Sequence, residues 1–399
     1  MLASLSLIIL VGLAMASIVQ KLKLPRIIGM LLMGVVLGPY GLNLLDESIL
    51  SISSELRKIA LIIILIKAGL SLDLADLKKV GRPAILMAFL PASFEIIAYT
   101  LFAPILLGIT RVEAMAMGAV LGAVSPAVVV PRMVNLIEKR YGTKKGIPQM
   151  ILAGASCDDV FVIAVFSTFT NMAQGGAANV GEFINIPASI CFGIAGGAMI
   201  GLFISYLAET AYANKHYIRN SMKVIIILGI SFALVSIEEL IKEYVAFSGL
   251  LAVVAMACTI KVKSVNIVSK RLSEKMGKLW LFAEVLLFVL VGAAVDIRYT
   301  LEAGIQALLM IAIALTIRGI GVYICMIGTE ITLKERIFCV ISYLPKATVQ
   351  AAIGSVPLAM GLSCGQIVLS VAVLGILITA PLGALGIDAS YKRLLEKET

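Results

Sequence analysis

Long apolar stretches separated by short polar connectors run along almost the whole chain. Most stretches approach or exceed the roughly 20 residues that a helix needs to cross a bilayer. Helices are the expected element, because a helix satisfies its own backbone hydrogen bonds within lipid. The pattern therefore predicts an all-α polytopic membrane protein. Its thirteen expected spans lie at approximately 2–20, 25–44, 56–74, 83–107, 113–136, 147–171, 186–211, 220–238, 244–262, 279–297, 301–328, 335–360 and 365–387.

Lys and Arg are concentrated in the connectors after the odd-numbered spans and in the C-terminal tail. Cytoplasmic loops of membrane proteins are enriched in these two residues. The bias predicts a multi-pass protein of the plasma (inner) membrane, with its N-terminus outside and its C-terminal "YKRLLEKET" in the cytoplasm. The net charge of +9 then reflects membrane topology, and no nucleic-acid partner is expected.

Composition supports the membrane assignment and narrows the chemistry. The chain is 60% hydrophobic and 14% charged, with a mean hydropathy of +1.05. Soluble domains are about 45–50% apolar and about 25% charged. His216 is the only histidine, and the six cysteines show no metal-ligand spacing, which disfavours zinc, haem and His-based catalytic sites. We therefore expect neither an enzymatic reaction nor a cofactor.

Two of the predicted spans are interrupted by proline. The fifth contains "VSPAVVVP", with Pro126 and Pro131, and the twelfth contains "YLPKATVQAAIGSVP", with Pro345. Proline removes a backbone donor and clashes with the preceding turn, so both helices are expected to break near mid-membrane. The two spans run in opposite directions. Matched broken helices in oppositely oriented halves are typical of inverted-repeat transporters, whereas the alternative is two proline kinks without function.

Two adjacent carboxylates, Asp158 and Asp159, lie within the sixth span. A charge near the bilayer centre costs at least ~2.5–3.5 kcal/mol, so each one needs a reason. Neighbouring helical residues point about 100° apart, so one acid can face an ion while the other meets a partner. A carboxylate that holds either a proton or a hard cation is the minimal site for cation/proton exchange. Ser125 and carbonyls freed at the fifth-span break are candidate further ligands; the alternative is a structural pair neutralised by a buried base.

Three further charges lie near the middle of their spans: Glu95, Arg318 and Lys346. Unpaired burial is costly, so we expect Arg318 to pair with Glu95 or with Asp158. Arginine does not release its proton in a protein, so Arg318 compensates charge without carrying H⁺. Lys346 either balances the partial charges of the broken helix ends or simply caps exposed carbonyls.

Four segments together resemble the monovalent cation/proton antiporters, specifically the paired-aspartate branch that includes NhaA and NapA, and within it the NHA group. They are "IIGMLLMGVVLGPYGL" (27–42), "LGAVSPAVVVP" (121–131), "GASCDDV" (154–160) and "YLPKATVQAAIG" (343–354). The resemblance covers nearly the whole chain. The last three motifs are specific in combination, whereas the glycine-rich opening is weak alone.

The resemblance implies an NhaA-like fold with inverted repeats and two broken crossing helices, in a homodimer that works by elevator-type alternating access. It implies a core domain at approximately 56–171 and 279–360, and a dimerisation scaffold at approximately 1–44, 186–262 and 365–387. It also assigns site residues. Asp159 is the principal cation and proton ligand, with Asp158 and Ser125 beside it and Lys346 at the second break.

One position departs from the pattern of many electrogenic relatives, which have a lysine where this chain has Arg318. In NHA-like proteins the matching arginine is expected to pair with the acid at Glu95. Because arginine does not cycle a proton, a stoichiometry of two protons per sodium is in doubt. Exchange is electroneutral if only the aspartates cycle.

The hypothesis from sequence is an Na⁺(Li⁺)/H⁺ antiporter in which ion and proton compete for Asp159 and Asp158. One alternative is K⁺/H⁺ exchange on the same site. Another is a sodium-coupled organic-anion symporter, which is disfavoured because small apolar residues flank the breaks: Ala123, Ala127, Val128 and Ala347. A gated channel and a non-transporting sensor remain as more distant alternatives.

Overall fold

The computed structural model describes residues 1–22, 24–71, 81–174, 180–213, 219–241, 247–296 and 304–398. His216 and parts of the predicted spans, at 72–74, 244–246, 297 and 301–303, lie outside the described residues. Every regular element within the described ranges is a helix, apart from one isolated antiparallel bridge between Tyr141 and Lys397. The prediction of an all-helical protein is confirmed.

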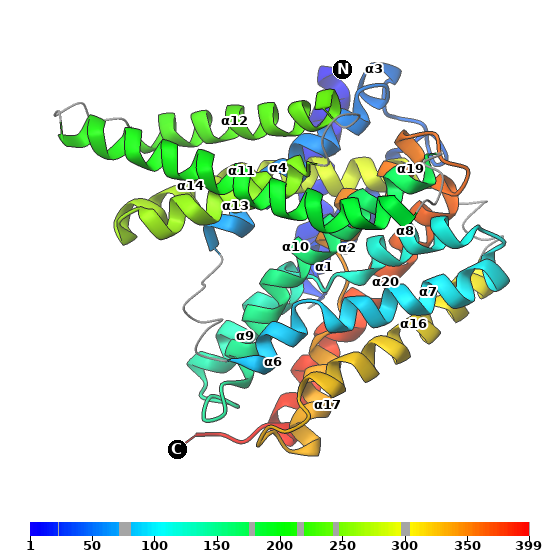
Figure 1. Ribbon diagram of the computed structural model, residues 1–399. Helices are drawn as coiled ribbons and strands as arrows, with labels where there is room; N and C mark the ends of the chain where they lie inside the picture. The colour runs from blue at the N-terminus through cyan, green and yellow to red at the C-terminus, as the bar shows by residue number, and fades with distance from the viewer. Residues whose placement is uncertain are drawn as a thin grey trace. The chain divides into compact units, whose positions relative to one another are not determined.

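The helices follow one another along the chain as Figure 1 shows. They are α1 (Leu2–Lys21), α2 (Arg26–Leu37), α3 (Glu47–Leu50), α4 (Ser53–Ser71), α6 (Arg82–Met87), α7 (Leu90–Leu107), α8 (Arg111–Gly122), α9 (Pro126–Glu138), α10 (Ile147–Ala173), α11 (Val180–Ala213), α12 (Asn220–Ile241), α13 (Gly249–Lys263), α14 (Asn266–Ala293), α16 (Gly304–Cys325), α17 (Leu333–Ser342), α18 (Thr348–Ile353), α19 (Val356–Ala359) and α20 (Gly365–Leu394).

Nine helical stretches of the described chain are long and apolar enough to cross a membrane. They coincide with nine of the thirteen spans expected from sequence. The other four expected spans are also helical, but they depart from a long apolar helix for identifiable reasons. Helices α2 and α13 have only 12 and 15 residues, α4 carries four charged side chains, and the twelfth span is divided into α17, α18 and α19.

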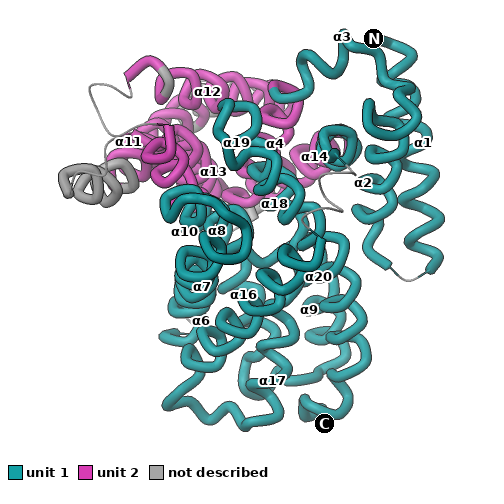
Figure 2. The backbone as a smooth tube through the Cα atoms, turned by 90° about the vertical axis from the view of Figure 1, so that its right-hand side faces the viewer, with its two compact units in different colours: residues 1–54, 73–162, 285–399 teal, residues 55–72, 163–284 magenta. Residues whose placement is uncertain are grey.

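The chain divides into two compact units, shown in separate colours in Figure 2. Unit 1 comprises residues 1–54, 73–162 and 285–399, and unit 2 comprises residues 55–72 and 163–284. Within unit 2, α13 packs against α11 and α12. A side chain at Gly197 of α11 would collide with the backbone of Ala252 on α13, so glycine is required for this close packing of the two helices.

Unit 1 contains the interrupted helices and all of the site residues predicted from sequence. Helix α7 packs against both α8 and α16, and in Figure 1 α7 and α16 run side by side. Helix α20 packs against both halves of each interrupted helix, namely α8 and α9, and α17 and α18. These contacts place the two interruptions in the interior of unit 1.

Candidate functional site

The first interruption lies between α8 and α9. Helix α8 ends at Gly122, Ala123 and Ser125 have extended backbone angles, and α9 begins at Pro126. Proline is favourable as the first residue of a helix, and it forces the preceding residue out of the helical region. Pro131 lies inside α9, which continues to Glu138. The break is therefore at Pro126, and Pro131 does not end the helix.

The second interruption lies between α17 and α18, where residues 343–347 are not helical and include Pro345. The two interruptions are bonded directly to each other. The backbone N–H of Ser125 donates to the carbonyl of Pro345 at 2.7 Å, and Gln350 Nε2 donates to the carbonyl of Ala123 at 2.9 Å. The breaks of two helices more than 200 residues apart thus meet inside unit 1.

The C-terminal end of α8 presents three successive carbonyls to donors from distant segments. Lys346 Nζ binds the carbonyl of Leu121, Arg318 Nη1 binds that of Gly122, and Gln350 Nε2 binds that of Ala123. The last carbonyls of a helix lack partners within the helix and carry its negative partial charge. Two buried cations and an amide satisfy them here, so Lys346 does cap a carbonyl, as one of its two predicted roles required.

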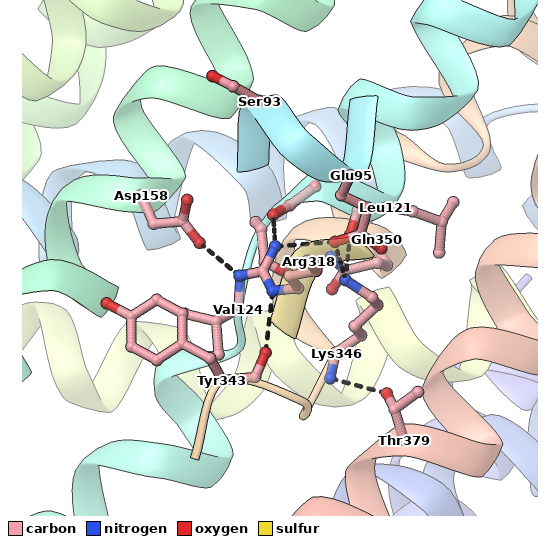
Figure 3. Close-up of polar contacts among 12 residues, drawn as sticks. Ser93, Glu95, Leu121, Val124, Asp158, Arg318, Tyr343, Lys346, Gln350 and Thr379 are labelled. Atoms are coloured by element: carbon pink, nitrogen blue, oxygen red, sulfur yellow. Dashed lines mark hydrogen bonds and ion pairs between the residues drawn. The ribbon is translucent and has the colours of Figure 1, made fainter. Parts of the chain in front are cut away.

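Glu95 of α7 joins the two bases. Its Oε2 atom accepts hydrogen bonds from Arg318 Nη1 and Lys346 Nζ, each at 2.8 Å (Figure 3). All three side chains are at most 1% exposed. Buried charges are tolerated when they are paired and hydrogen-bonded, and this triad meets both conditions. The predicted pairing of Arg318 with Glu95 is confirmed.

Asp158 of α10 is also tied to this network. Its Oδ2 atom accepts a hydrogen bond from the backbone N–H of Val124 at 2.8 Å and from Arg318 Nη2 at 3.2 Å (Figure 3). The second predicted pairing of Arg318 is therefore present together with the first. Asp158 is fully buried and is fixed to the residue before Ser125 in the first break.

Asp159 differs from its neighbour. It is 6% exposed, and within the described part of the chain it has neither a hydrogen bond nor an ion pair. An isolated buried carboxylate is expensive unless it is protonated or neutralised by a cation. Asp159 therefore has the property expected of a carboxylate that binds an ion the protein does not itself supply.

Further buried oxygens near the breaks lack a protein partner among the described residues. Ser125 occupies the N-cap position of α9, yet its hydroxyl makes no capping bond, and Asp158 Oδ1 is likewise unpaired. Thr348 opens α18 with an unpaired hydroxyl as well. Buried polar atoms are nearly always hydrogen-bonded, so such a set is unusual. The predicted ligands Asp159, Asp158 and Ser125 are thus among the buried residues here that keep an oxygen without a partner in the described chain, and oxygen atoms are the ligands that a hard cation prefers.

Sequence reasoning missed two residues of the network. Gln350 bridges the breaks, since its Oε1 accepts from the N–H of Ala347 at 2.7 Å while its Nε2 binds Ala123. Thr379 of α20 accepts a hydrogen bond from the backbone N–H of Lys346 at 2.9 Å. Gln350 could have been identified from sequence, because it is a polar residue in an apolar span. Thr379 could not, because isolated threonines are ordinary in membrane helices.

Tyr343 packs between α10 and the charge network. Its carbonyl accepts a hydrogen bond from Arg318 Nε at 3.0 Å, and its ring lies 5.6 Å from the Arg318 guanidinium. A Cβ atom at Gly154 would overlap the Tyr343 hydroxyl, so a larger residue one turn before Asp158 would force this side chain to move. Glycine at this position therefore allows the Tyr343 ring to pack closely against α10.

An all-helical multi-pass protein, with interrupted helices that meet beside buried acids, has the features of an ion-coupled membrane transporter. A sequence profile described as "Sodium/hydrogen exchanger, transmembrane" matches residues 5–389. The chain therefore belongs to the sodium/hydrogen exchanger family, which comprises transporters rather than enzymes. The resemblance to cation/proton antiporters is confirmed.

Individual relatives agree with the family assignment. The chain is 35% identical over 388 residues to sodium/hydrogen exchanger 9B2 of Mus musculus, covering 94% of this chain and 69% of that protein. It is 32% identical over 386 residues to sodium/hydrogen exchanger 9B1 of Homo sapiens, covering 91% of this chain and 71% of that protein. The fold matches the sodium proton antiporter MjNhaP1 of Methanocaldococcus jannaschii with a TM-score of 0.83, at 21% identity and over 98% and 97% of the two chains.

Proposed function

We propose that this protein exchanges Na⁺ or Li⁺ for H⁺ across a membrane, and that Asp159 is the carboxylate that binds either ion. Sodium/proton antiport is the activity of the family to which the chain belongs. The observation that supports the site assignment is that Asp159 is buried and has no hydrogen-bond or ion-pair partner among the described residues, whereas the adjacent Asp158 has two. Ser125 and Asp158 Oδ1 complete the proposed set of ligands.

The charge balance of the buried network favours the binding of one monovalent cation or one proton at a time. Asp158 and Glu95 are two acids, and Arg318 and Lys346 are two bases, so the four sum to zero when all are ionised. Asp159 adds one negative charge, which either a proton or a monovalent cation neutralises. Both loaded states are then equally neutral, so a one-for-one, electroneutral exchange follows if only Asp159 cycles.

The proposal includes the architecture expected from the resemblance. Thirteen spans form inverted repeats, and the two interrupted helices cross near the bilayer centre. A core at approximately 56–171 and 279–360 moves against a dimeric scaffold at approximately 1–44, 186–262 and 365–387. The N-terminus lies outside the plasma (inner) membrane and the C-terminus in the cytoplasm, as the distribution of Lys and Arg favours.

The proposal is tested in proteoliposomes that carry a pH-sensitive dye. Addition of Na⁺ or Li⁺ is expected to drive proton movement, with the same rate whether or not K⁺ and valinomycin clamp the voltage. A response to K⁺ in place of Na⁺ would support the K⁺/H⁺ alternative on the same site. The antiport proposal fails if none of the three cations moves protons.

A further inference from the structure

Both interrupted helices begin with the same four-residue cap. In α8, Glu113 Oε2 accepts hydrogen bonds from the backbone N–H and the hydroxyl of Thr110, each at 2.8 Å. In α17, Glu335 Oε2 accepts the same two bonds from Thr332, at 2.7 and 2.8 Å. Each glutamate lies three residues after its threonine, which is the capping-box arrangement.

Each of these glutamates also binds a residue from a distant turn. Glu113 Oε1 accepts a hydrogen bond from the hydroxyl of Ser363, in the turn that follows α19. Glu335 Oε2 accepts one from Lys145 Nζ at 2.8 Å, in the turn that follows α9. A capping box alone needs no such partner, and surface glutamates in first turns are normally solvated. Here Glu113 and Glu335 are only 8% and 2% exposed.

The two contacts are reciprocal. The first half of one interrupted helix, α8, is tied to the turn after the second interrupted helix ends. The first half of that second helix, α17, is tied to the turn after α9, where the other interrupted helix ends. Together with the bonds between the breaks, the two helices are joined at three places. We call these outer contacts the Glu113 clamp (Thr110, Glu113, Ser363) and the Glu335 clamp (Thr332, Glu335, Lys145).

The clamps affect the proposed ion site because they fix the positions of α8 and α17 along their helix axes. The carbonyls that hold Lys346 and Arg318 are the last of α8, and Glu113 lies at the start of the same helix. A helix rises 1.5 Å per residue and transmits an axial shift along its length. Binding sites tolerate displacements of only about 0.5 Å, so a small slip of α8 or α17 would misalign the breaks.

We propose that Glu113 and Glu335 are positioning residues for cation exchange, acting through Ser363 and Lys145 to hold the two interrupted helices in register. This role rests on the proposed function and extends it to residues far from Asp159. The clamps do not touch the transported ion. They fix the half-helices whose ends carry the network around Asp158.

The structure offers variants that open each clamp while leaving its capping box intact. Lys145→Ala removes the donor to Glu335, and Ser363→Ala removes the donor to Glu113. Each is expected to raise the KM for Na⁺ roughly threefold to tenfold, because a hydrogen bond to a charged group is lost, with the maximal rate within about twofold of the wild type. Lys145→Arg is expected to restore the wild-type KM, since arginine keeps the charged donor.

Lys144→Ala is the matched control, because the structure shows no ion pair for this neighbouring lysine within the described residues. Its KM is expected to be unchanged. An unchanged KM in both clamp variants overturns the proposal, and so does a loss of maximal rate without a change in KM. If the wild type itself shows no exchange, the proposed function fails and not the clamps.

A second measurement does not depend on transport. Hydrogen exchange followed by mass spectrometry reports opening of the backbone at residues 121–126 and 343–348. Lys145→Ala and Ser363→Ala are expected to speed exchange at both breaks by at least threefold, and Lys144→Ala at neither. Equal exchange in the clamp variants and the wild type overturns the positioning role.

Discussion

Asp158 and Asp159 are adjacent on α10 and carry the same functional group, yet within the described chain only Asp158 has hydrogen-bond partners. Asp158 accepts hydrogen bonds from Val124 and Arg318, whereas Asp159 has no partner within the described chain. The step of about 100° between neighbouring helical residues is enough to separate the two environments. The two adjacent acids are therefore not equivalent: Asp158 belongs to the buried charge network, whereas Asp159 is the acid to which we assign ion binding in the proposed function.

The largest expected effect on transport is that of Asp159→Asn, which removes the charge of the acid that has no partner within the described chain. Na⁺-driven proton movement is expected to disappear, because the amide neither exchanges a proton nor neutralises a cation. Thermal stability without Na⁺ should be kept, since Asp159 makes no hydrogen bond or ion pair with the described residues. Asp388→Asn, at a half-exposed carboxylate paired with Arg132, is the control and should transport normally. Near-normal exchange by Asp159→Asn would show that the ion binds elsewhere.

Glu95→Gln tests the buried ion-pair network that surrounds Asp158. It leaves Arg318 and Lys346 without their shared carboxylate, and breaking a buried ion pair costs about 3–5 kcal/mol. We expect a large fall in the melting temperature of the purified protein, far exceeding that of Asp159→Asn. The reverse order of stabilities would contradict the division between a structural network and an ion-binding acid.

Protons and Na⁺ are expected to compete for Asp159. A proton on Asp159 removes the charge that attracts Na⁺, so Na⁺ affinity is lost as the pH falls and saturates as it rises. On the acid side, the KM for Na⁺ should increase about tenfold per pH unit if one proton competes. The measurement is Na⁺ dependence of dye dequenching at a series of pH values. A KM independent of pH would rule out a shared site.

Arg318→Lys is expected to have a smaller effect on rate. Arginine binds Glu95, Asp158 and two carbonyls at once, and lysine lacks the planar fork that makes these bonds possible. We expect exchange to slow by roughly threefold to tenfold and to become sensitive to the valinomycin clamp, because lysine can release a proton. Voltage-independent exchange by this variant would show that the base at 318 does not set the stoichiometry.

The smallest effect is expected for Tyr343→Phe. The hydroxyl has no hydrogen-bond partner among the described residues, while the ring and the carbonyl make the contacts to Arg318. Removing it should change the exchange rate and KM by less than about twofold, since an unpaired hydroxyl contributes little to stability. A larger loss in the same assay would place this hydroxyl among the ligands of the ion.

Several features of the site follow from local properties of the chain. The break at Pro126 and the irregular backbone at Pro345 were predictable, because proline acts on its own turn. The burial of Asp158, Glu95, Arg318 and Lys346 followed from their positions in apolar spans. Four spans were harder to predict as helices of full length, because helix ends and interruptions depend on neighbouring segments as well as on hydropathy.

Hydropathy and proline positions were sufficient to predict an all-helical membrane protein with two interrupted helices and a small set of buried charges. Hydropathy and proline chemistry are local, and each can be evaluated along a single segment. The pairing of these buried charges, in contrast, became evident only once the helices were packed together. Glu95 and Lys346 are separated by 251 residues, and Gln350 and Ala123 by 227. Such pairings depend on how whole helices pack, so no single segment shows that Asp158 is hydrogen-bonded while Asp159 has no such partner among the described residues.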